Sequence, residues 1–371
     1  MRRCYELLES TSRSFYAVIM NLDPELKPAI CIFYLVLRGL DTIEDDMTLD
    51  VDYKSQLLRD FYKVLEKDCW NFTQSGENQK DRILLVEFDC VIREFCKLKK
   101  AYQEVIISIT KQMAEGMIYY AAAIVETLED WDKYCYHVAG LVGIGLSKIF
   151  SVSGLEDESV GSTTELSIAM GLFLQKTNII RDFLEDFSEG RIFWPSSVWK
   201  KYAKRIEDFK NIRNKQEALQ CLNELITNTL KHVPQVLGYL NSLQNQSVFN
   251  FCAIPQVMAI TTLALCYNNY SVFTGCVKIR KGLAVKLMTN TTTPAHVQWT
   301  FFTELKEIYD KTDQEPMANA ETMKVLKECF QLPMIAPLLK KGRLLRLEGN
   351  RPIIFCLLFV ATLILSVKMQ Q

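Results

Sequence analysis

Two short acidic segments have the residue types and the spacing that a metal site needs. Residues 41–45 and residues 182–186 both read Asp-x-x-Glu-Asp. On an α-helix the first, fourth and fifth positions of such a segment share one face, so each segment would project a cluster of carboxylates. Oxygen donors without imidazole or thiolate suit Mg²⁺, which commonly bridges protein carboxylates to substrate phosphates. Taken alone, one such cluster is more often a solvated surface that carries ion pairs.

The segments upstream of both clusters are apolar around nearly their whole circumference. Residues 30–37 read Ile-Cys-Ile-Phe-Tyr-Leu-Val-Leu, and residues 170–174 read Met-Gly-Leu-Phe-Leu. We expect helices of this composition to be largely buried, where an unpaired carboxylate becomes protonated or destabilises the fold. A cationic group must therefore lie between the two clusters, which favours a metal–diphosphate site at the rim of an apolar cavity.

The polar residues form one stripe on each of these predicted helices. At about 100° per residue, those of the second helix fall within about 60° of Gln175; they are Asn178, Asp182 and Asp186. A similar stripe on the first helix consists of Tyr34, Arg38, Asp41 and Asp45. Two such stripes facing one another would hold a diphosphate above a binding site for hydrocarbon.

Helical periodicity dominates the rest of the chain and predicts an all-α fold. Apolar residues recur at three- and four-residue spacing through 25–46, 54–68, 82–122, 131–151, 163–187, 215–243, 252–270 and 296–310. A hydrophobic content of 49% excludes a disordered chain, and a net charge of −1 gives no electrostatic case for nucleic-acid binding. The 12 cysteines include no CxxC motif, and we expect most of them to be buried free thiols. The N-terminus has no apolar run typical of a signal peptide.

The C-terminal part of the chain differs in kind. The 15 residues Ile353–Val367 carry no charge and follow a basic stretch at 340–346. As a helix they would span about 22 Å, less than the hydrocarbon core of ~30 Å, so a buried C-terminal helix is the alternative. We favour a membrane anchor, because the flanking Arg351 and Lys368 can extend to the interface. This interpretation divides the chain into a catalytic domain (1–310), a linker (311–350) and an anchor (351–371).

Several segments resemble those of the squalene/phytoene synthase family. Its signature segments are similar to Thr-Ser-Arg-Ser-Phe at 11–15, Asp-Thr-Ile-Glu-Asp-Asp at 41–46 and residues 178–186. Residues 134–146, 246–256 and 277–282 resemble the animal members in particular, and the match runs from about Cys4 to Leu287. The resemblance implies a class I isoprenoid-synthase helical fold with a central cavity, preceded in most members by a longer N-terminal segment.

The same resemblance implies the reaction. Two farnesyl diphosphates would be condensed head-to-head to presqualene diphosphate, which NADPH would then reduce to squalene, the first committed step of sterol biosynthesis. Mg²⁺ and NADPH would be the cofactors, and the expected partners are farnesyl diphosphate and membrane lipid, without nucleic acid. A monomeric catalytic domain would face the cytosol from the endoplasmic reticulum membrane.

Carried over by position, the resemblance also implies roles for individual residues. The ligands of the Mg²⁺–diphosphate would be Asp41, Glu44, Asp45, Asp182 and Asp186. Tyr134 matches a tyrosine that handles a proton in the condensation, and Phe251 matches an aromatic residue associated with the reduction. The positions linked to the diphosphate and to the NADPH phosphates are matched by Arg13, Arg38, Arg181, Lys278 and Arg280.

Each of these residues also has a simpler interpretation. Without the resemblance, Tyr134 and Phe251 would be ordinary core residues, and the basic loop at 278–282 a solvated surface. Gly140, Gly143 and Gly145 lack the order and the preceding strand of a nucleotide loop, so we expect close helix–helix approach there. The alternative functions are a non-reducing phytoene- or dehydrosqualene-type synthase and a catalytically inactive, membrane-tethered helical binding protein. The two intact acidic clusters argue against the inactive protein.

Overall fold

The computed structural model describes residues 1–121, 123–312 and 319–339, apart from the side chains of residues 13 and 14. This part of the chain is helical and contains no strand, which confirms the all-α prediction. The predicted anchor (351–371), including Ile353–Val367, lies outside the described residues.

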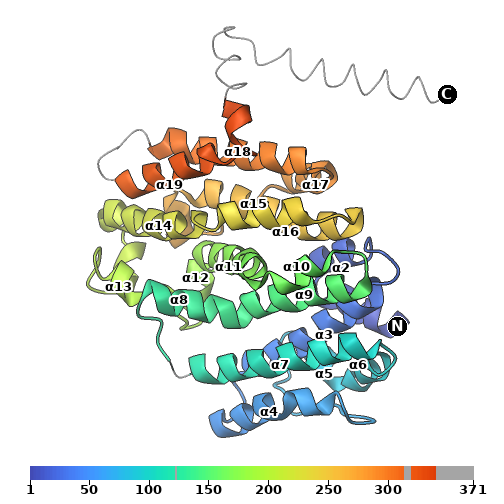
Figure 1. The fold of residues 1–371 in the computed structure, drawn as a ribbon. Helices are drawn as coiled ribbons and strands as arrows, with labels where there is room; N and C mark the ends of the chain where they lie inside the picture. Colours follow the sequence, from blue (N-terminus) through green and yellow to red (C-terminus); the bar gives the residue numbers. More distant parts are fainter. Residues whose placement is uncertain (122, 313–318, 340–371) are drawn as a thin grey trace, which may run out of the picture.

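The first third of the chain builds one side of the molecule (Figure 1). Its helices are α1 (Arg2–Thr11), α2 (Arg13–Ile19), α3 (Lys27–Glu44), α4 (Val51–Val64), α5 (Arg82–Val86), α6 (Phe88–Phe95) and α7 (Lys100–Tyr120). Pro28 in the first turn of α3 starts that helix where a backbone N–H is not needed. From there α3 is buried along most of its length, as its apolar sequence predicts.

The middle of the chain surrounds a central helix, α11. The elements are α8 (Leu128–Cys135), the π-helix η1 (Tyr136–Gly140), α9 (Leu141–Ser153), α10 (Glu158–Ser162), α11 (Thr164–Arg181), α12 (Phe183–Ser188) and α13 (Ser196–Trp199). Figure 1 shows α11 between α8–α9 on one side and α15–α16 on the other, and it packs against all of them. The central helix therefore joins the two halves of the molecule.

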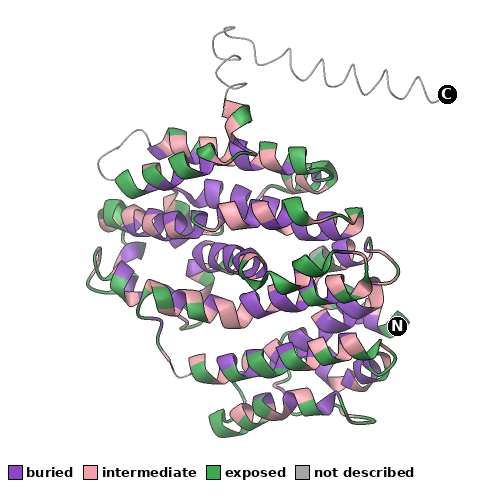
Figure 2. Ribbon diagram, in the orientation of Figure 1, coloured by how far each residue is buried: buried purple, intermediate pink, exposed green. Residues whose placement is uncertain are grey.

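The last third forms the remaining layers. Its elements are η2 (Ile206–Lys210), η3 (Ile212–Asn214), α14 (Lys215–Leu230), α15 (Val233–Ser242), α16 (Gln246–Cys266), η4 (Tyr270–Phe273), α17 (Lys281–Asn290), α18 (Pro294–Thr312) and α19 (Ala320–Gln331). Burial follows this arrangement: α11 and α16 are mostly buried, whereas the outer helices expose one face (Figure 2).

Helix α19 lies inside the region that the sequence suggests as a linker (311–350). It is a regular helix that packs against α14 and α18 and buries Val325, Leu326 and Cys329. Its apolar residues at three- and four-residue spacing give it a buried face, which a linker lacks. The helical body therefore continues beyond residue 310, as far as the described chain at 339.

Glycines allow the helices around the cavity to approach closely. A Cβ at Gly143 would lie 2.2 Å from the carbonyl oxygen of Ser167 on α11, and one at Gly171 would lie 2.3 Å from that of Ala139. A Cβ at Gly145 would lie 2.6 Å from the ring of Phe33. No side chain fits at such distances, which confirms the prediction of close helix packing for this glycine-rich segment.

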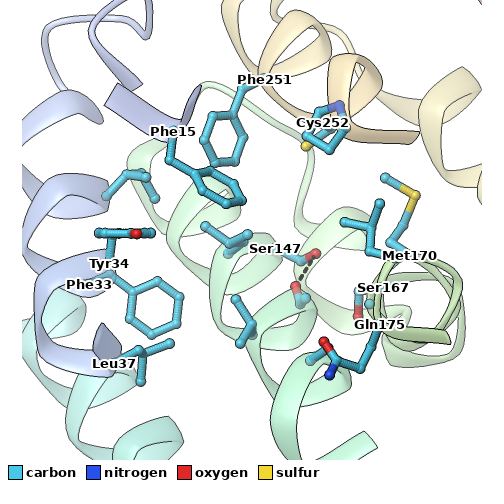
Figure 3. A pocket seen from close by; sticks show the side chains of 18 of the residues that line it. Phe15, Phe33, Tyr34, Leu37, Ser147, Ser167, Met170, Gln175, Phe251 and Cys252 are labelled. Carbon is cyan, nitrogen blue, oxygen red and sulfur yellow. Dashed lines mark hydrogen bonds between the residues drawn. The ribbon is translucent and has the colours of Figure 1, made fainter. Parts of the chain in front are cut away.

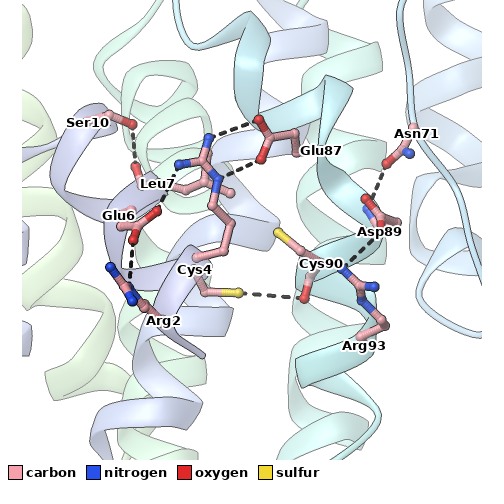
Figure 4. A network of polar contacts seen from close by, with 11 residues as sticks. Arg2, Cys4, Glu6, Leu7, Ser10, Asn71, Glu87, Asp89, Cys90 and Arg93 are labelled. Carbon is pink, nitrogen blue, oxygen red and sulfur yellow. Dashed lines mark hydrogen bonds and ion pairs between the residues drawn. The ribbon is translucent and has the colours of Figure 1, made fainter.

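The N-terminal helix is held against α5 and α6 by a polar network (Figure 4). The guanidinium of Arg3 donates to both carboxylate oxygens of Glu87, at 2.6 and 2.9 Å, and also pairs with Glu6. Next to it, the thiol of Cys4 donates to the carbonyl oxygen of Cys90. The 11 described cysteines are all free and most are buried, as the sequence predicts.

Within the described residues, two helical stretches are long and apolar enough to cross a membrane, Leu128–Ser153 and Gln246–Cys266. Both contribute side chains to the wall of the same internal cavity. Their apolar character is therefore explained by the cavity and the core.

Candidate active site

The first acidic cluster lies at the C-terminal end of α3. Asp41 and Glu44 are in its last turn, Asp45 caps it, and about 40% of the Asp45 side chain is exposed. Asp46 is buried and accepts hydrogen bonds from Thr48 and from the backbone N–H of Gly76. Asp46 therefore closes a turn, whereas the other three carboxylates remain at the rim of the site.

The second acidic cluster follows α11 and is less regular than the sequence suggests. The helix ends at Arg181, and Asp182 stands between α11 and α12 with ψ of 15°. The backbone still links the turns, because Asp182 N–H donates to Asn178 and Asp186 N–H donates to Asp182. Asp182 and Asp186 are partly buried, while Glu185 is exposed.

Arg191, in the loop after α12, brings the two clusters together. Its guanidinium lies 3.0 Å from Oδ1 of Asp45 and 3.4 Å from Oδ1 of Asp186, and it also pairs with Glu189. A cation between the clusters is what buried carboxylates require, and here a side chain supplies it. Sequence reasoning missed Arg191, because no periodic pattern places a loop residue opposite α3.

Two further arginines pair with the rim carboxylates. Arg181 holds Asp182, with Nε 2.8 Å from Oδ1. Arg38 reaches Asp41 at 4.0 Å, but its stronger partner is Asp81, with Nε 2.7 Å from Oδ2. Asp81 has a left-handed backbone (φ 60°), a conformation that aspartate tolerates better than most residues. It lies in a polar loop without a motif, so the sequence carried no signal for it.

Three arginines do not neutralise this concentration of carboxylates. Burial, more than the neighbouring Asp45, raises the pKa of Asp41 to about 7. Burial together with Asp45 and Asp41 raises the pKa of Glu44 to about 7. Burial also raises the pKa of Asp186 to about 6, although Arg191 opposes the shift. The rim is therefore a site where additional positive charge would be stabilised.

Among the described residues, no three Asp, Glu, His or Cys side chains converge closely enough to hold a metal ion directly. The five predicted ligands therefore remain a prediction. The donor set nevertheless fits Mg²⁺: it consists of carboxylate oxygens from two elements, with excess negative charge and partial access to solvent. Asp45 pairs with Arg191 and Asp182 pairs with Arg181, so the arginines hold these carboxylates apart from one another.

An apolar cavity of about 410 Å³ lies directly below the rim. Figure 3 shows Phe33, Tyr34 and Leu37 of α3 on one side, Met170 and Gln175 of α11 across from them, and Phe251 of α16 above. Arg38, Asp41 and Asn178 also line it, so the cavity reaches the first acidic cluster and the last turn of α11 before the second cluster. Inside it, the hydroxyl groups of Ser147 and Tyr239 are paired at 2.6 Å, which leaves a mostly apolar interior.

The structure brings Tyr134 to the acidic rim and Phe251 to the cavity. Tyr134 stacks on Phe193, with ring centroids 5.0 Å apart. Burial is the main cause that raises the pKa of Tyr134 well above its usual value, with contributions from Glu44 and Asp186. Phe251 is only 6% exposed and packs edge-on against Phe150. Both residues therefore lie in the site, at different depths.

The other predicted basic residues are placed differently. Lys278 and Arg280 are exposed, do not line the cavity and have no ion-pair partner among the described residues. They follow η4, whose Phe273 packs against Phe183 of α12 with the ring centroids 5.1 Å apart. The loop is therefore anchored beside the second acidic cluster. Arg13 begins α2, and its side chain lies outside the described part.

An all-α scaffold, two carboxylate clusters joined by arginine and an apolar cavity beside them define an enzyme for long apolar substrates that carry an anionic group. A family model of squalene/phytoene synthases matches residues 8–282. The chain belongs to the squalene/phytoene synthase family and is an enzyme.

Named relatives are similar over most of the chain. The squalene synthase of Mus musculus is 53% identical, over 88% of this chain and 78% of the relative. That of Homo sapiens is 52% identical with the same coverage, and that of Schizosaccharomyces pombe is 48% identical over 91% of this chain and 74% of the relative.

Solved structures agree. A ligand complex of TcSQS superposes with a TM-score of 0.87 at 41% identity, covering 89% of this chain and 97% of the other. A dehydrosqualene synthase with a ligand gives a TM-score of 0.55 at 18% identity, over 78% of this chain and 94% of the other. That second likeness concerns the fold alone, and it confirms the predicted isoprenoid-synthase helical fold.

Proposed function

We propose that this chain condenses two farnesyl diphosphates head-to-head to presqualene diphosphate and reduces this intermediate with NADPH to squalene. The observation that carries the proposal is an apolar cavity whose wall includes Asp41 of the first carboxylate cluster, which Arg191 joins to the second cluster. The similarity to squalene synthases at about half identity supports the reductive reaction over a non-reducing one.

The rim would hold the diphosphates. Mg²⁺, bound by Asp41, Glu44, Asp45, Asp182 and Asp186, would neutralise the leaving group's charge as a Lewis acid. Arg38 and Arg181 already stand at this rim and would donate oriented hydrogen bonds to phosphate oxygens. Arg191 would exchange part of its carboxylate contacts for the same purpose. Arg13 is assigned to this group by position in the sequence.

The cavity would hold the farnesyl chains and protect the cationic intermediates from water. Phe15 of α2, Phe33 and Tyr34 of α3 and Phe251 of α16 line it. Aromatic faces stabilise a nearby cation through their quadrupole, and a dry interior prevents its capture by water. Phe251 lies deeper than the carboxylates, which suits a role in the later, reductive half of the reaction.

Tyr134 is assigned the proton transfer of the condensation. Its phenol is close to Glu44 and Asp186 and to the guanidinium of Arg191. In this charged setting the proton could leave toward a carboxylate or toward the departing diphosphate. The raised pKa means that the phenol of Tyr134 is protonated in the ligand-free protein.

NADPH would bind through the exposed loop that contains Lys278 and Arg280. These two cations have no partner among the described residues, and their loop is packed beside α12 through Phe273. The proposal includes membrane attachment through residues 351–371, with the catalytic domain in the cytosol at the endoplasmic reticulum. These assignments rest on the sequence and on the family.

Product analysis tests the function. Purified protein with farnesyl diphosphate and Mg²⁺ should release pyrophosphate and form presqualene diphosphate, and with NADPH it should form squalene. Dehydrosqualene or phytoene-type products without any need for NADPH would instead identify a non-reducing synthase. No consumption of farnesyl diphosphate under either condition would contradict the proposal.

A further inference from the structure

A fully buried lysine lies next to the cavity-lining residues of α11. Gln175 and Asn178 face the cavity. Lys176 is turned from Gln175 by about 100° around the helix, so it points between α8, α14 and the start of α15. Only 1% of its side chain is exposed. The reaction described above makes no use of this cation.

The ammonium group of Lys176 meets acceptors from three different elements. Nζ lies 2.6 Å from Oδ1 of Asn228 on α14 and 3.0 Å from Nε2 of His232, the residue before α15. It also forms an ion pair with Asp132 on α8 and stands 4.9 Å from the ring centroid of Trp131. An ammonium has three N–H donors; two of them serve Asn228 and His232, and the carboxylate of Asp132 balances the charge.

The neighbours of Lys176 are adapted to this arrangement. Burial and the ammonium lower the pKa of His232 to about 3, so its ring is neutral and Nε2 can accept a hydrogen bond. Trp131 is completely buried and covers the cation with its face. A buried charge is tolerated only when its partners are held in place, which makes the cluster rigid.

The Lys176 cluster connects the two elements that carry the chemistry. Asp132 precedes Tyr134 by two residues on α8, and α11 leads directly to Arg181 and Asp182. Within the described part of the chain, no other ion pair joins α8 to α11. This contact therefore contributes, together with the packing of η1 against α11, to the position of the Tyr134 phenol relative to the second acidic cluster.

We propose that Lys176 is a positioning residue, which fixes Tyr134 against the second acidic cluster by tying α8 to α11 and does not touch substrate. The inference rests on the proposed function, because it takes the proton step of the condensation as the step that Tyr134 serves. A misplacement of about 1 Å at a reacting group commonly costs about 100-fold in rate. A small shift of α8 would therefore be visible in turnover.

The test compares Lys176→Met with Lys176→Arg in the full chain. Met retains the length of the side chain without its charge, whereas Arg retains the cation and can still reach Asp132. Pyrophosphate release from farnesyl diphosphate with Mg²⁺ and without NADPH reports the condensation alone. For Lys176→Met we expect kcat to fall about 10- to 100-fold with KM within about 2-fold of wild type. Lys176→Arg should recover most of the loss.

A matched control removes another lysine that ties two helices. Lys311 donates to the carbonyl oxygen of Ala264 on α16 at 2.6 Å and pairs with Glu307 on its own helix, α18. Lys311→Met removes the same charge without affecting α8. It should lower the melting temperature and leave kcat and KM at wild-type values.

A second variant covers the case in which Lys176→Met fails to fold. Asp132 is 45% exposed, so Asp132→Asn removes only the charge of the ion pair at a tolerant position. It should lower kcat several-fold in the same direction, with KM unchanged. If a folded Lys176→Met or Asp132→Asn has wild-type kcat and KM, the lysine is a stability element only and the proposal is wrong. Failure of the proposed function is recognised separately, because wild-type protein would then release no pyrophosphate.

Discussion

The guanidinium of Arg191 lies 3.0 Å from the carboxylate of Asp45, although 146 positions separate the two residues in the chain. The same guanidinium lies 3.4 Å from Asp186. One loop cation therefore joins the end of α3 to α12 across the mouth of the cavity. The raised pKa values of Asp41, Glu44 and Asp186 indicate that this bridge leaves negative charge without compensation.

Removing one carboxylate from either cluster should stop the reaction at its first step. We expect Asp41→Asn or Asp182→Asn to reduce farnesyl diphosphate consumption at least about 100-fold, because a metal that stabilises the leaving group contributes several kcal/mol. No later intermediate should accumulate, and the far-ultraviolet circular dichroism should match wild type. The control is Asp52→Asn, at an exposed position on α4. Near-normal turnover in either variant would contradict the proposal that both carboxylate clusters bind the metal.

Removing the arginine bridge should make the fold more dependent on metal. In Arg191→Met the carboxylates of Asp45 and Asp186 lose a shared cation. Because both are partly solvated, the loss is expected to be about 0.5–1 kcal/mol, or ~1–3 °C in melting temperature, without metal. Mg²⁺ should then raise the melting temperature of the variant more than that of wild type. Equal Mg²⁺ effects in both proteins would show that the metal does not bind where the bridge lies. Lys204→Met, at an exposed position outside the site, is the control.

Part of this site could be predicted, because helical spacing and the apolar character of the flanking residues determine it. Carboxylates at the end of an apolar helix have few stable environments, so their spacing together with the apolar segments upstream predicted a rim position, and the structure places Asp41 in the cavity wall. The glycines at 140–145 likewise indicated close packing, which the contacts of Gly143 with Ser167 confirm.

The remaining features depend on tertiary contacts that have no local signal. Arg191 and Asp81 lie in loops, where neither periodicity nor a motif fixes which helix they will face. The burial of Lys176 could not be read from its sequence, since a lysine inside a helix usually extends to solvent. Helix α19 was missed because its short apolar pattern follows a polar stretch typical of a linker.

Metal binding should release protons below neutral pH. Burial raises the pKa values of Asp41 and Glu44 from 3.8 and 4.5 to about 7 in the metal-free protein. Ligands must be deprotonated, so Mg²⁺ affinity should rise between pH 6 and 8. Because both groups are about three-quarters protonated at pH 6.5, about 1.5 protons should be released there and almost none by about pH 8.5. Titration calorimetry in buffers of different ionisation enthalpy measures this number; no proton release at pH 6.5 would contradict the assignment.

The same pKa shifts predict how stability depends on pH. A carboxyl whose pKa is raised by folding contributes stability below its unfolded pKa and loses it as the pH rises through the folded value. From Asp41 and Glu44 the metal-free protein should therefore lose stability between about pH 4 and pH 8. Mg²⁺ should restore it above pH 7. Thermal unfolding with EDTA and with Mg²⁺ across this range tests the sign, and a metal-free stability that falls less toward pH 8 in Asp41→Asn than in wild type would support it, whereas an equal fall in both proteins would contradict it.

Truncation before Arg351 should release a soluble, active protein. All the proposed site residues precede residue 281, and the last described helix, α19, ends at Gln331. Detergent-free extraction followed by the condensation assay should find activity in the supernatant, with kcat within about 2-fold of the full chain. Aggregation or unfolding of the truncated protein would mean that residues 353–367 form a core helix.

The last prediction separates the reduction from the condensation. If Lys278 and Arg280 hold NADPH, replacing both with Ala removes two charge-assisted contacts to phosphate, each worth roughly 1.5–3 kcal/mol. Additive losses would weaken NADPH binding by about two to four orders of magnitude. The carboxylate rim is untouched, so presqualene diphosphate should accumulate at ordinary NADPH concentrations and decline at high ones. Lys67→Ala combined with Lys204→Ala, at two exposed positions elsewhere, is the control for lost positive charge. Squalene formation with an unchanged NADPH requirement in the Lys278/Arg280 variant would make this loop a solvated surface and place the cofactor elsewhere.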